Sequence, residues 1–159
     1  MASQVTALLP YATVALLALL SAASATPTAT TLNGTYAGRH LAEFSQDLFL
    51  GIPYAEAPRL RNPESLSKPW TDKRPATAYG FACETLASAA SLESVNVTMS
   101  EDCLNLNIVR PSGTHSRSKL AVVVCLHGGG FTSRFGAERT TNASYVVKAS
   151  VQNNIPSSP

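Results

Sequence analysis

The sequence has little charge, and what charge it has is not clustered. Charged residues make up 14% of its 159 residues, and the formal net charge is only +2. Because the 12 lysines and arginines are scattered, the sequence gives no electrostatic basis for binding nucleic acid or an anionic membrane surface. No fixed-period repeat is present either. A chain of this length is expected to form one domain.

The sequence also lacks a hydrophobic run long enough for a stable membrane span of about 20 residues. A short apolar run extends from Leu8 to Leu20, and Ala23 and Ala25 then form an A-x-A arrangement. A short apolar run followed by small residues predicts a signal peptide over residues 1–25, and therefore a secreted, extracellular protein. A buried core helix is the alternative, which the position so close to the N-terminus disfavours.

Secretion changes how the few cysteines and the sequons are interpreted. In an oxidising compartment two of the three cysteines can pair and one is left over; they are Cys83, Cys103 and Cys125. Three N-x-[ST] sequons predict glycosylation sites on exposed loops or turns, at Asn33, Asn96 and Asn142.

Glycine and proline divide the first half of the mature chain into short pieces. Residues 26–31 are expected to be a flexible tail, and residues 32–54 contain short apolar stretches between glycines that predict small antiparallel strands. Residues 55–75 hold four prolines, which excludes a helix and predicts an ordered loop. Trp70 is expected to pack this loop onto the body of the protein.

The second half of the chain has the pattern of an α/β protein. Residues 104–108 alternate between apolar and polar, which predicts a strand with one buried face. Residues 120–126 are continuously apolar and rich in β-branched residues, which predicts a central strand covered on both faces, with Cys125 buried in it. Helical spacing from Asn142 onward predicts a short helix.

A glycine-rich turn follows the predicted central strand, in the segment His127–Phe131, which reads HGGGF. Three glycines remove every Cβ, so their amides are able to converge on a negative oxygen, such as the one formed when a carbonyl is attacked. A flexible turn or a phosphate-binding loop is the alternative. The sequence lacks the Gly-Lys-Ser/Thr and G-x-G-x-x-G patterns that phosphate and dinucleotide sites require.

Four segments, taken in order, resemble the type-B carboxylesterase/lipase family, which includes fungal lipases and the cholinesterases. GIPYA starts at Gly51, an R-L-x-x-P segment starts at Arg59, SEDCLNLN starts at Ser100, and HGGGF starts at His127. The resemblance covers residues 32–154 and implies the N-terminal portion of an α/β-hydrolase mixed sheet. It implies a carboxylic ester as substrate, with no cofactor and no metal.

The resemblance also implies roles for individual residues. It assigns oxyanion-hole amides to Gly129 and Gly130, a disulfide to Cys83 and Cys103, and a buried ion pair to Arg59 and Glu101. A surface cation is the alternative for Arg59. His127 opens the glycine turn and is not the family's catalytic base, which lies downstream of the nucleophile. Arg134 occupies a position where the family usually has glycine.

The sequence lacks the G-x-S-x-G nucleophile elbow that an esterase of this fold requires, and the acid and histidine that follow it. We therefore expect a chain truncated before the nucleophile elbow, with an aberrant or truncated end at residues 155–159. It is expected to be the N-terminal part of a secreted serine esterase or lipase, inactive by itself. The alternative is a non-catalytic, secreted binding or adhesion-type relative of the cholinesterases. The sequence does not indicate an oligomeric state.

Overall fold

The computed structural model describes residues 25–85, 92–93 and 95–154. Its elements are, in chain order, β1 (Thr28–Thr30), β2 (Thr35–Ala37), β3 (Arg39–Leu41), η1 (Ala42–Phe44), β4 (Gln46–Pro53), β5 (Ala55–Glu56), β6 (Glu64–Ser65), β7 (Lys73–Pro75), β8 (Asn105–Pro111), η2 (Arg139–Thr141) and α3 (Ser144–Gln152). Within these described ranges, no helix has the length and apolar character needed to cross a membrane.

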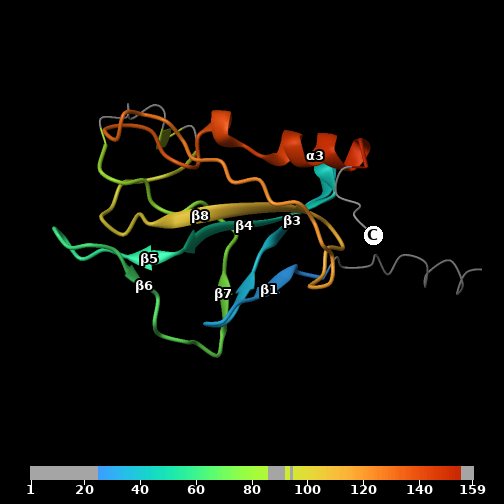
Figure 1. Ribbon diagram of the computed structural model, residues 1–159, viewed down its shortest axis with the longest axis horizontal. Coiled ribbons are helices and arrows are strands. Elements are labelled where there is room, and N and C mark those ends of the chain that lie inside the picture. The colour runs from blue at the N-terminus through green and yellow to red at the C-terminus, as the bar shows by residue number, and fades with distance from the viewer. Residues whose placement is uncertain (1–24, 86–91, 94, 155–159) are drawn as a thin grey trace, which may run out of the picture.

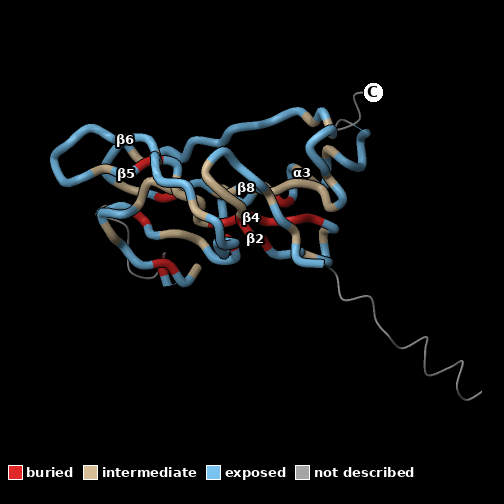
Figure 2. Tube along the Cα trace, turned by 90° about the horizontal axis from the view of Figure 1, so that it is seen from below, coloured by how far each residue is buried: buried red, intermediate tan, exposed pale blue. Residues whose placement is uncertain are grey.

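The centre of the fold is a three-stranded antiparallel sheet in the order β3-β4-β8. β4 forms its middle, because its run of large apolar residues is buried on both faces. Leu48, Phe49 and Leu50 expose 4%, 1% and 2% of their surface. Buried residues lie along β4 and in β2, and further buried segments lie elsewhere in the molecule (Figure 2).

Different layers cover the two faces of this sheet (Figure 1). On one side lies α3, where the buried Gln46 donates a hydrogen bond from Nε2 to the carbonyl oxygen of Ser144 at 2.9 Å. On the other side lies a mixed sheet in the order β1-β2-β7, with β2 antiparallel to β1 and parallel to β7. Tyr36 and Ala76 from this second layer pack against Phe49.

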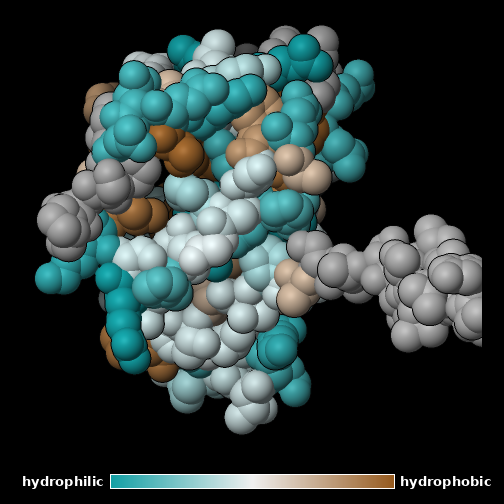
Figure 3. All heavy atoms as spheres, turned by 90° about the vertical axis from the view of Figure 1, so that its right-hand side faces the viewer, coloured by the Kyte–Doolittle hydropathy of each residue, from teal (hydrophilic) through white to brown (hydrophobic). Residues whose placement is uncertain are grey.

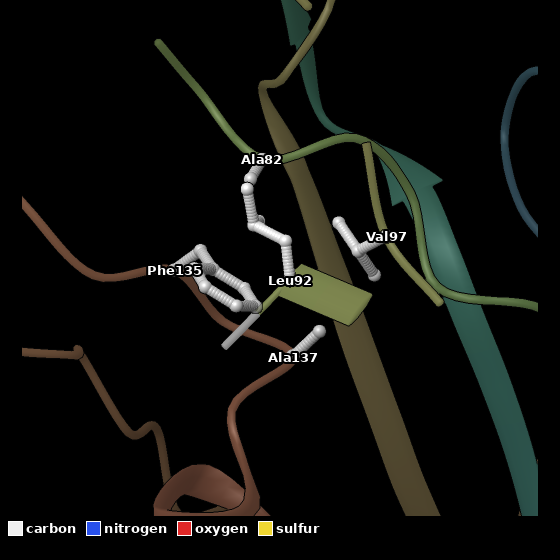
Figure 4. Close-up of a cluster of buried hydrophobic side chains, with 5 residues drawn as sticks. All are labelled: Ala82, Leu92, Val97, Phe135 and Ala137. Carbon is white, nitrogen blue, oxygen red and sulfur yellow. The ribbon is translucent and has the colours of Figure 1, made fainter. Parts of the chain in front are cut away.

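A separate apolar cluster joins three distant segments of the chain (Figure 4). Its members point toward one another from the segment before the first cysteine of the disulfide, from the segment inside the disulfide loop, and from the segment after the glycine turn. They are Ala82, Leu92, Val97, Phe135 and Ala137. This cluster fixes the segment that follows the glycine turn to the body of the protein.

Several predictions for the first half of the chain need correction. Residues 28–30, expected to lie in a flexible tail over 26–31, form β1, because their backbone pairs with β2. Residues 55–75, expected to be a loop, contain the short strands β5, β6 and β7. Trp70 does pack this region onto the body, with its ring edge against Tyr36 at 5.2 Å between centroids. The predicted signal peptide, except its last residue, and the predicted aberrant end at 155–159 lie outside the described residues.

The prediction of a buried central strand at residues 120–126 is wrong for the described chain. The segment has no regular structure, and Val122, Val123, Val124 and Leu126 are exposed, as is Cys125. A strand needs backbone partners, and among the residues placed by the structure none hydrogen-bonds to residues 121–126. Apolar patterning alone therefore does not make this strand.

Other apolar side chains are also exposed, including Tyr145 and Val146 on α3. On the face drawn in Figure 3, hydrophobic side chains reach the surface at several separate places among polar ones. The helical spacing after Asn142 forms α3, as predicted. The alternating segment forms the strand β8, but the prediction that its apolar face is buried is wrong for the described chain: Leu106 and Ile108 expose 38% and 45% of their surface.

Candidate functional site

The glycine turn is closed by hydrogen bonds to a single carbonyl group. The carbonyl oxygen of Gly129 accepts from the backbone amides of Thr132 and Ser133, both at 3.1 Å. Gly129 has φ of 122° and Gly130 has φ of 60°, conformations that residues with a Cβ rarely adopt. The backbone therefore needs glycine at Gly129 and favours it at Gly130, whereas Phe131 and Arg134 adopt φ of 61° and 74° in spite of their side chains.

The three glycines differ in the space available for a Cβ atom. A Cβ at Gly129 would overlap the carbonyl group of Ser133, whereas a Cβ at Gly128 or Gly130 would meet no atom within 4 Å. Within the part of the chain that the structure describes, no acceptor hydrogen-bonds to the amides of Gly129 and Gly130. These two consecutive N–H groups remain available as donors. Gly128, Gly130 and Phe131 are exposed, so in the described residues the turn lies at the surface.

Contacts on its C-terminal side hold the turn in place. Phe135 and Ala137 are buried in the cluster of Figure 4. Thr85, two residues after Cys83, donates a hydrogen bond from Oγ1 to the carbonyl oxygen of Thr132 at 3.0 Å. The loop closed by the disulfide is therefore in direct contact with the glycine turn.

Asn107 is a positioning residue to which the sequence analysis assigned no role. Its Oδ1 accepts from the amide of Gly51 at 2.9 Å, and its Nδ2 donates to the carbonyl oxygen of Gly136 at 3.3 Å. The side chain thus links β4, β8 and the segment that follows the glycine turn. The sequence feature that could have identified Asn107 is its place as the last residue of SEDCLNLN.

Gly51 explains the start of the GIPYA segment. The register of β4 against β8 shifts between Phe49 and Ile52, and Gly51 has φ of 65° within this irregularity. A Cβ on Gly51 would approach the amide nitrogen of Gly80 to 2.7 Å and the carbonyl oxygen of Ala78 to 2.8 Å. Only glycine fits both the backbone conformation and the close approach of this neighbouring segment.

The predicted disulfide between Cys83 and Cys103 is present. Asn105, two residues after Cys103, donates hydrogen bonds from Nδ2 to the carbonyl oxygens of Phe81 and Cys103, at 2.9 and 3.0 Å. The first asparagine of the LNLN segment therefore ties the beginning of β8 to both ends of the disulfide-closed loop.

Arg59 and Glu101 are paired, but the prediction that they are buried is wrong. The Nη1 atom of Arg59 contacts Oε1 of Glu101, and the two side chains expose 75% and 51% of their surface. Ion pairs this exposed contribute about 0–1 kcal/mol, because water screens the charges. In the described chain this pair is a surface contact.

Arg134 has the backbone conformation that a glycine would be expected to supply. Its φ is 74°, which accounts for the family's usual glycine at this position. Its Nε donates to Oε2 of Glu138 at 2.8 Å, and its Nη2 donates to Thr140 at 2.7 Å. The hydrogen bond from Arg134 lowers the pKa of the Glu138 carboxyl, and the same bond raises the pKa of Arg134.

A second cluster contains serine, histidine and aspartate but lacks the geometry of a triad. Ser112 Oγ and Asp47 Oδ1 both contact the same ring nitrogen of His40, Nδ1, at 3.0 and 3.3 Å. A triad requires the serine and the carboxylate on opposite ring nitrogens. Asp47 also pairs with Arg110 at 3.4 Å. His40 therefore ties β3 to β4 and to the end of β8.

The remaining histidines take no part in such a cluster. His127 is exposed, and its Nδ1 lies 2.8 Å from the carbonyl oxygen of Gly128. His115 is exposed in the polar turn after β8. In the described ranges, no three histidine, cysteine, aspartate or glutamate side chains are grouped as they would be around a metal ion.

The three sequons lie in different surroundings. Asn96 is exposed in a turn, with φ of 53°. Asn142 is exposed, and its Oδ1 accepts from the amide of Ser144 at the start of α3, at 2.9 Å. Asn33 is half-buried and donates from Nδ2 to the carbonyl oxygen of Leu66 at 2.9 Å. Glycosylation at these residues stays a prediction.

Comparison with known proteins gives one consistent family. Residues 23–152 match the carboxylesterase family. The chain is 33% identical over 149 residues to carboxylesterase 1F of Mus musculus, covering 81% of this chain and 27% of the relative. It is 36% identical over 114 residues to the secreted lipase ARB07186/07185 of Arthroderma benhamiae, covering 69% and 20%. It is 35% identical over 138 residues to lipase 2 of Diutina rugosa, covering 73% and 25%.

A solved structure supports the same assignment for the fold. The chain superposes on a PNB esterase with a TM-score of 0.66 and 31% identity, covering 77% of this chain and 25% of that one. The chain thus spans about a quarter of the length of these relatives. The predicted fold, the N-terminal portion of an α/β-hydrolase mixed sheet, is confirmed. On the strength of the family match and these similarities, the chain belongs to the carboxylesterase family.

Proposed function

We propose that this chain is the N-terminal part of a secreted carboxylic-ester hydrolase, and that Gly129 and Gly130 supply two backbone donors of its oxyanion hole. The observation that carries the proposal is the pair of consecutive amides that no acceptor among the described residues hydrogen-bonds, in a turn whose backbone favours glycine at both positions. Membership in the carboxylesterase family supports ester hydrolysis as the reaction class.

The chemistry follows from where charge develops. When a serine oxygen attacks an ester carbonyl, the carbonyl oxygen becomes negative and needs donors that are already in position. Losing one such donor typically raises the barrier by about 3–4 kcal/mol. This sequence contains no G-x-S-x-G segment to supply the serine, and the acid and the histidine that follow that segment in the family are absent as well. We therefore propose that the chain alone does not turn over esters.

Two measurements test this proposal. The purified chain is mixed with a short-chain p-nitrophenyl ester, and release of p-nitrophenol is expected to equal that of buffer. Turnover that a serine-directed fluorophosphonate abolishes would contradict the missing-triad account. The genomic DNA after the codon for Pro156 is expected to contain a frame that encodes an apolar strand followed by G-x-S-x-G. The absence of such a frame would count against an ester hydrolase.

The secreted location has a separate test. It is supported by the Cys83–Cys103 disulfide and by the similarity to a secreted lipase. N-terminal sequencing of protein recovered from the medium of a eukaryotic host is expected to begin at Thr26. Retention in the cell with Met1 or Ala2 at the N-terminus would contradict export.

The second candidate is a non-catalytic, secreted binding or adhesion-type protein. The observation that favours it is that a disulfide and two buried apolar clusters form within this chain alone. Thermal unfolding of residues 26–159 separates the two candidates. A cooperative transition favours a self-sufficient scaffold, and the absence of a transition favours a part of a larger enzyme.

A further inference from the structure

An open groove of about 370 Å³ lies on the side of the molecule formed by β2, the end of β4 and β6. Its lining is mostly apolar and aromatic, with Asn33, Tyr36, Ile52, Tyr54, Leu66 and Trp70 among its residues. Its size is near the lower end of small-molecule sites, which are about 300–1,000 Å³. Tyr54 exposes 53% of its surface here, and Leu32 at the rim is fully exposed.

One lining residue, Asn33, begins a glycosylation sequon. Its Nδ2 donates to the carbonyl oxygen of Leu66, which also lines the groove, at 2.9 Å, while its carbonyl oxygen accepts from the amide of Trp70 at 2.8 Å. The next residue of the sequon is Gly34, where a Cβ would overlap the Trp70 ring. The sequon is therefore built into the wall of the groove.

We propose that this groove holds the first N-acetylglucosamine of an N-glycan attached to Asn33. The inference rests on the secreted location in the proposed function, because N-glycosylation occurs during export. The amide nitrogen carries two hydrogens, so one continues to donate to Leu66 while the other is replaced by the sugar. The sugar comes from a lipid diphosphate oligosaccharide. A bond forms between Nδ2 and C1, the bond from C1 to the diphosphate oxygen breaks, and the displaced proton leaves with the diphosphate.

A sugar fits the groove because both are amphipathic. The C–H faces of the ring cover the apolar side chains of Ile52, Leu66 and Tyr54, and the hydroxyl groups remain in water because the groove is open. A covalently attached occupant also avoids most of the translational entropy cost that a free ligand pays. The groove therefore favours a sugar attached to Asn33 over a free ligand.

The other two sequons provide matched controls, because neither lines this groove. Asn96 has a left-handed backbone, which aspartate tolerates. Asn142 accepts a hydrogen bond from the amide of Ser144 on Oδ1, and aspartate keeps that oxygen. The variant Asn96→Asp/Asn142→Asp therefore leaves Asn33 as the acceptor, and the variant Asn33→Asp/Asn142→Asp leaves Asn96.

The test uses the full chain from a eukaryotic host that leaves high-mannose glycans. Peptide mass spectrometry measures occupancy of each sequon. Endoglycosidase H then trims the glycan to one N-acetylglucosamine, whereas peptide N-glycosidase F removes it completely and converts asparagine to aspartate. Trp70 is the single tryptophan of the sequence, so its fluorescence reports on the groove.

We expect Asn33 to be occupied. Trimming to one sugar is expected to leave Trp70 emission and iodide quenching unchanged, and complete removal is expected to shift the emission to longer wavelength and increase quenching. The variant with its glycan at Asn96 is expected to show no change with either enzyme. Unchanged fluorescence after complete removal from Asn33 would overturn the inference.

Occupancy also separates this inference from the proposed function. Glycan on Asn96 or Asn142 with none on Asn33 would overturn the inference and leave export in place. If no sequon carries a glycan, both the inference and export to a glycosylating compartment are contradicted.

Discussion

Replacing Gly129 by alanine tests the geometry of the glycine turn most sharply. The residue has φ of 122°, and a Cβ there would overlap the carbonyl group of Ser133. The two neighbouring glycines provide a graded comparison. Gly130 has φ of 60° with open space around it, and Gly128 combines open space with a backbone that is not left-handed.

The expected costs differ among the three positions. For Gly129→Ala, the backbone conformation costs about 1–3 kcal/mol, and the steric overlap adds about 1–3 kcal/mol. Because the turn is exposed and is able to shift, we expect the lower end, about 2 kcal/mol. Gly130→Ala carries the backbone cost alone, about 1–2 kcal/mol. Gly128→Ala is expected to be neutral or to stabilise by about 0.4–1 kcal/mol, because alanine restricts the unfolded chain.

Each variant is placed in a complete fold by replacing the matching part of the solved PNB esterase with residues 32–154. The assay is urea unfolding of this parent and of each variant, combined with amide hydrogen exchange. The amides of Thr132 and Ser133 donate to Gly129 in the parent, and we expect Gly129→Ala to accelerate their exchange. The order of stability is expected to be Gly128→Ala, then Gly130→Ala, then Gly129→Ala. Equal stabilities, with unchanged exchange at Thr132 and Ser133, would refute the account of the turn.

Three further predictions concern the surroundings of the turn. Replacing Cys83 and Cys103 by serine is expected to lower the free energy of unfolding by about 3 kcal/mol, because the disulfide closes a loop of 20-residue separation; a urea midpoint equal to that of the parent would contradict this. Asn107→Leu leaves the amide of Gly51 and the carbonyl of Gly136 without their partner, and is expected to cost about 1–3 kcal/mol in the same assay. The Glu138 carboxyl has a lowered pKa in the folded state, so its stabilising contribution is present above its ordinary value of 4.5 and is lost as the pH falls through the folded pKa. Thermal unfolding below pH 4.5 is therefore expected to show a steeper loss of Tm for the parent than for Glu138→Gln, and parallel curves would contradict it.

Sequence patterns predicted those elements whose partners lie within the chain. The residues of β8 pair with β4, and the helix after Asn142 packs through Ser144 against Gln46, so both elements formed, although the apolar face of β8 is exposed. The short strand β1 was missed because residues 26–31 carry no apolar pattern, and backbone pairing with β2 decides their conformation. Local patterning does not reveal such pairing.

The segment 120–126 shows the opposite error. Its apolar, β-branched residues predicted a buried strand, but burial depends on neighbouring strands and covering helices. Within the described ranges it has neither, so Val123 and Val124 are exposed. The apolar pattern indicates that the segment requires neighbouring strands and covering helices, and the described part of the chain does not supply them.

The candidate site, like the fold, was predicted only in part. The glycine turn was identified from the sequence and the disulfide from the family resemblance, and the structure explains two glycines by their positive φ. The link made by Asn107 was not predicted, because hydrogen bonds of a side chain to Gly51 and Gly136 depend on tertiary contacts. The prediction that Arg59 and Glu101 are buried was wrong, because burial also depends on tertiary contacts.

The proposed role of the turn is tested most directly by giving it a nucleophile. A chimera in which residues 32–154 replace the matching part of the solved PNB esterase is assayed for kcat on a p-nitrophenyl ester, with thermal unfolding as a check of folding. We expect turnover, unchanged by Gly128→Ala and reduced about 10²–10³-fold by Gly129→Ala, because the second substitution displaces the donating amides. A folded chimera without activity, or one in which Gly129→Ala retains the parent kcat, would contradict the account.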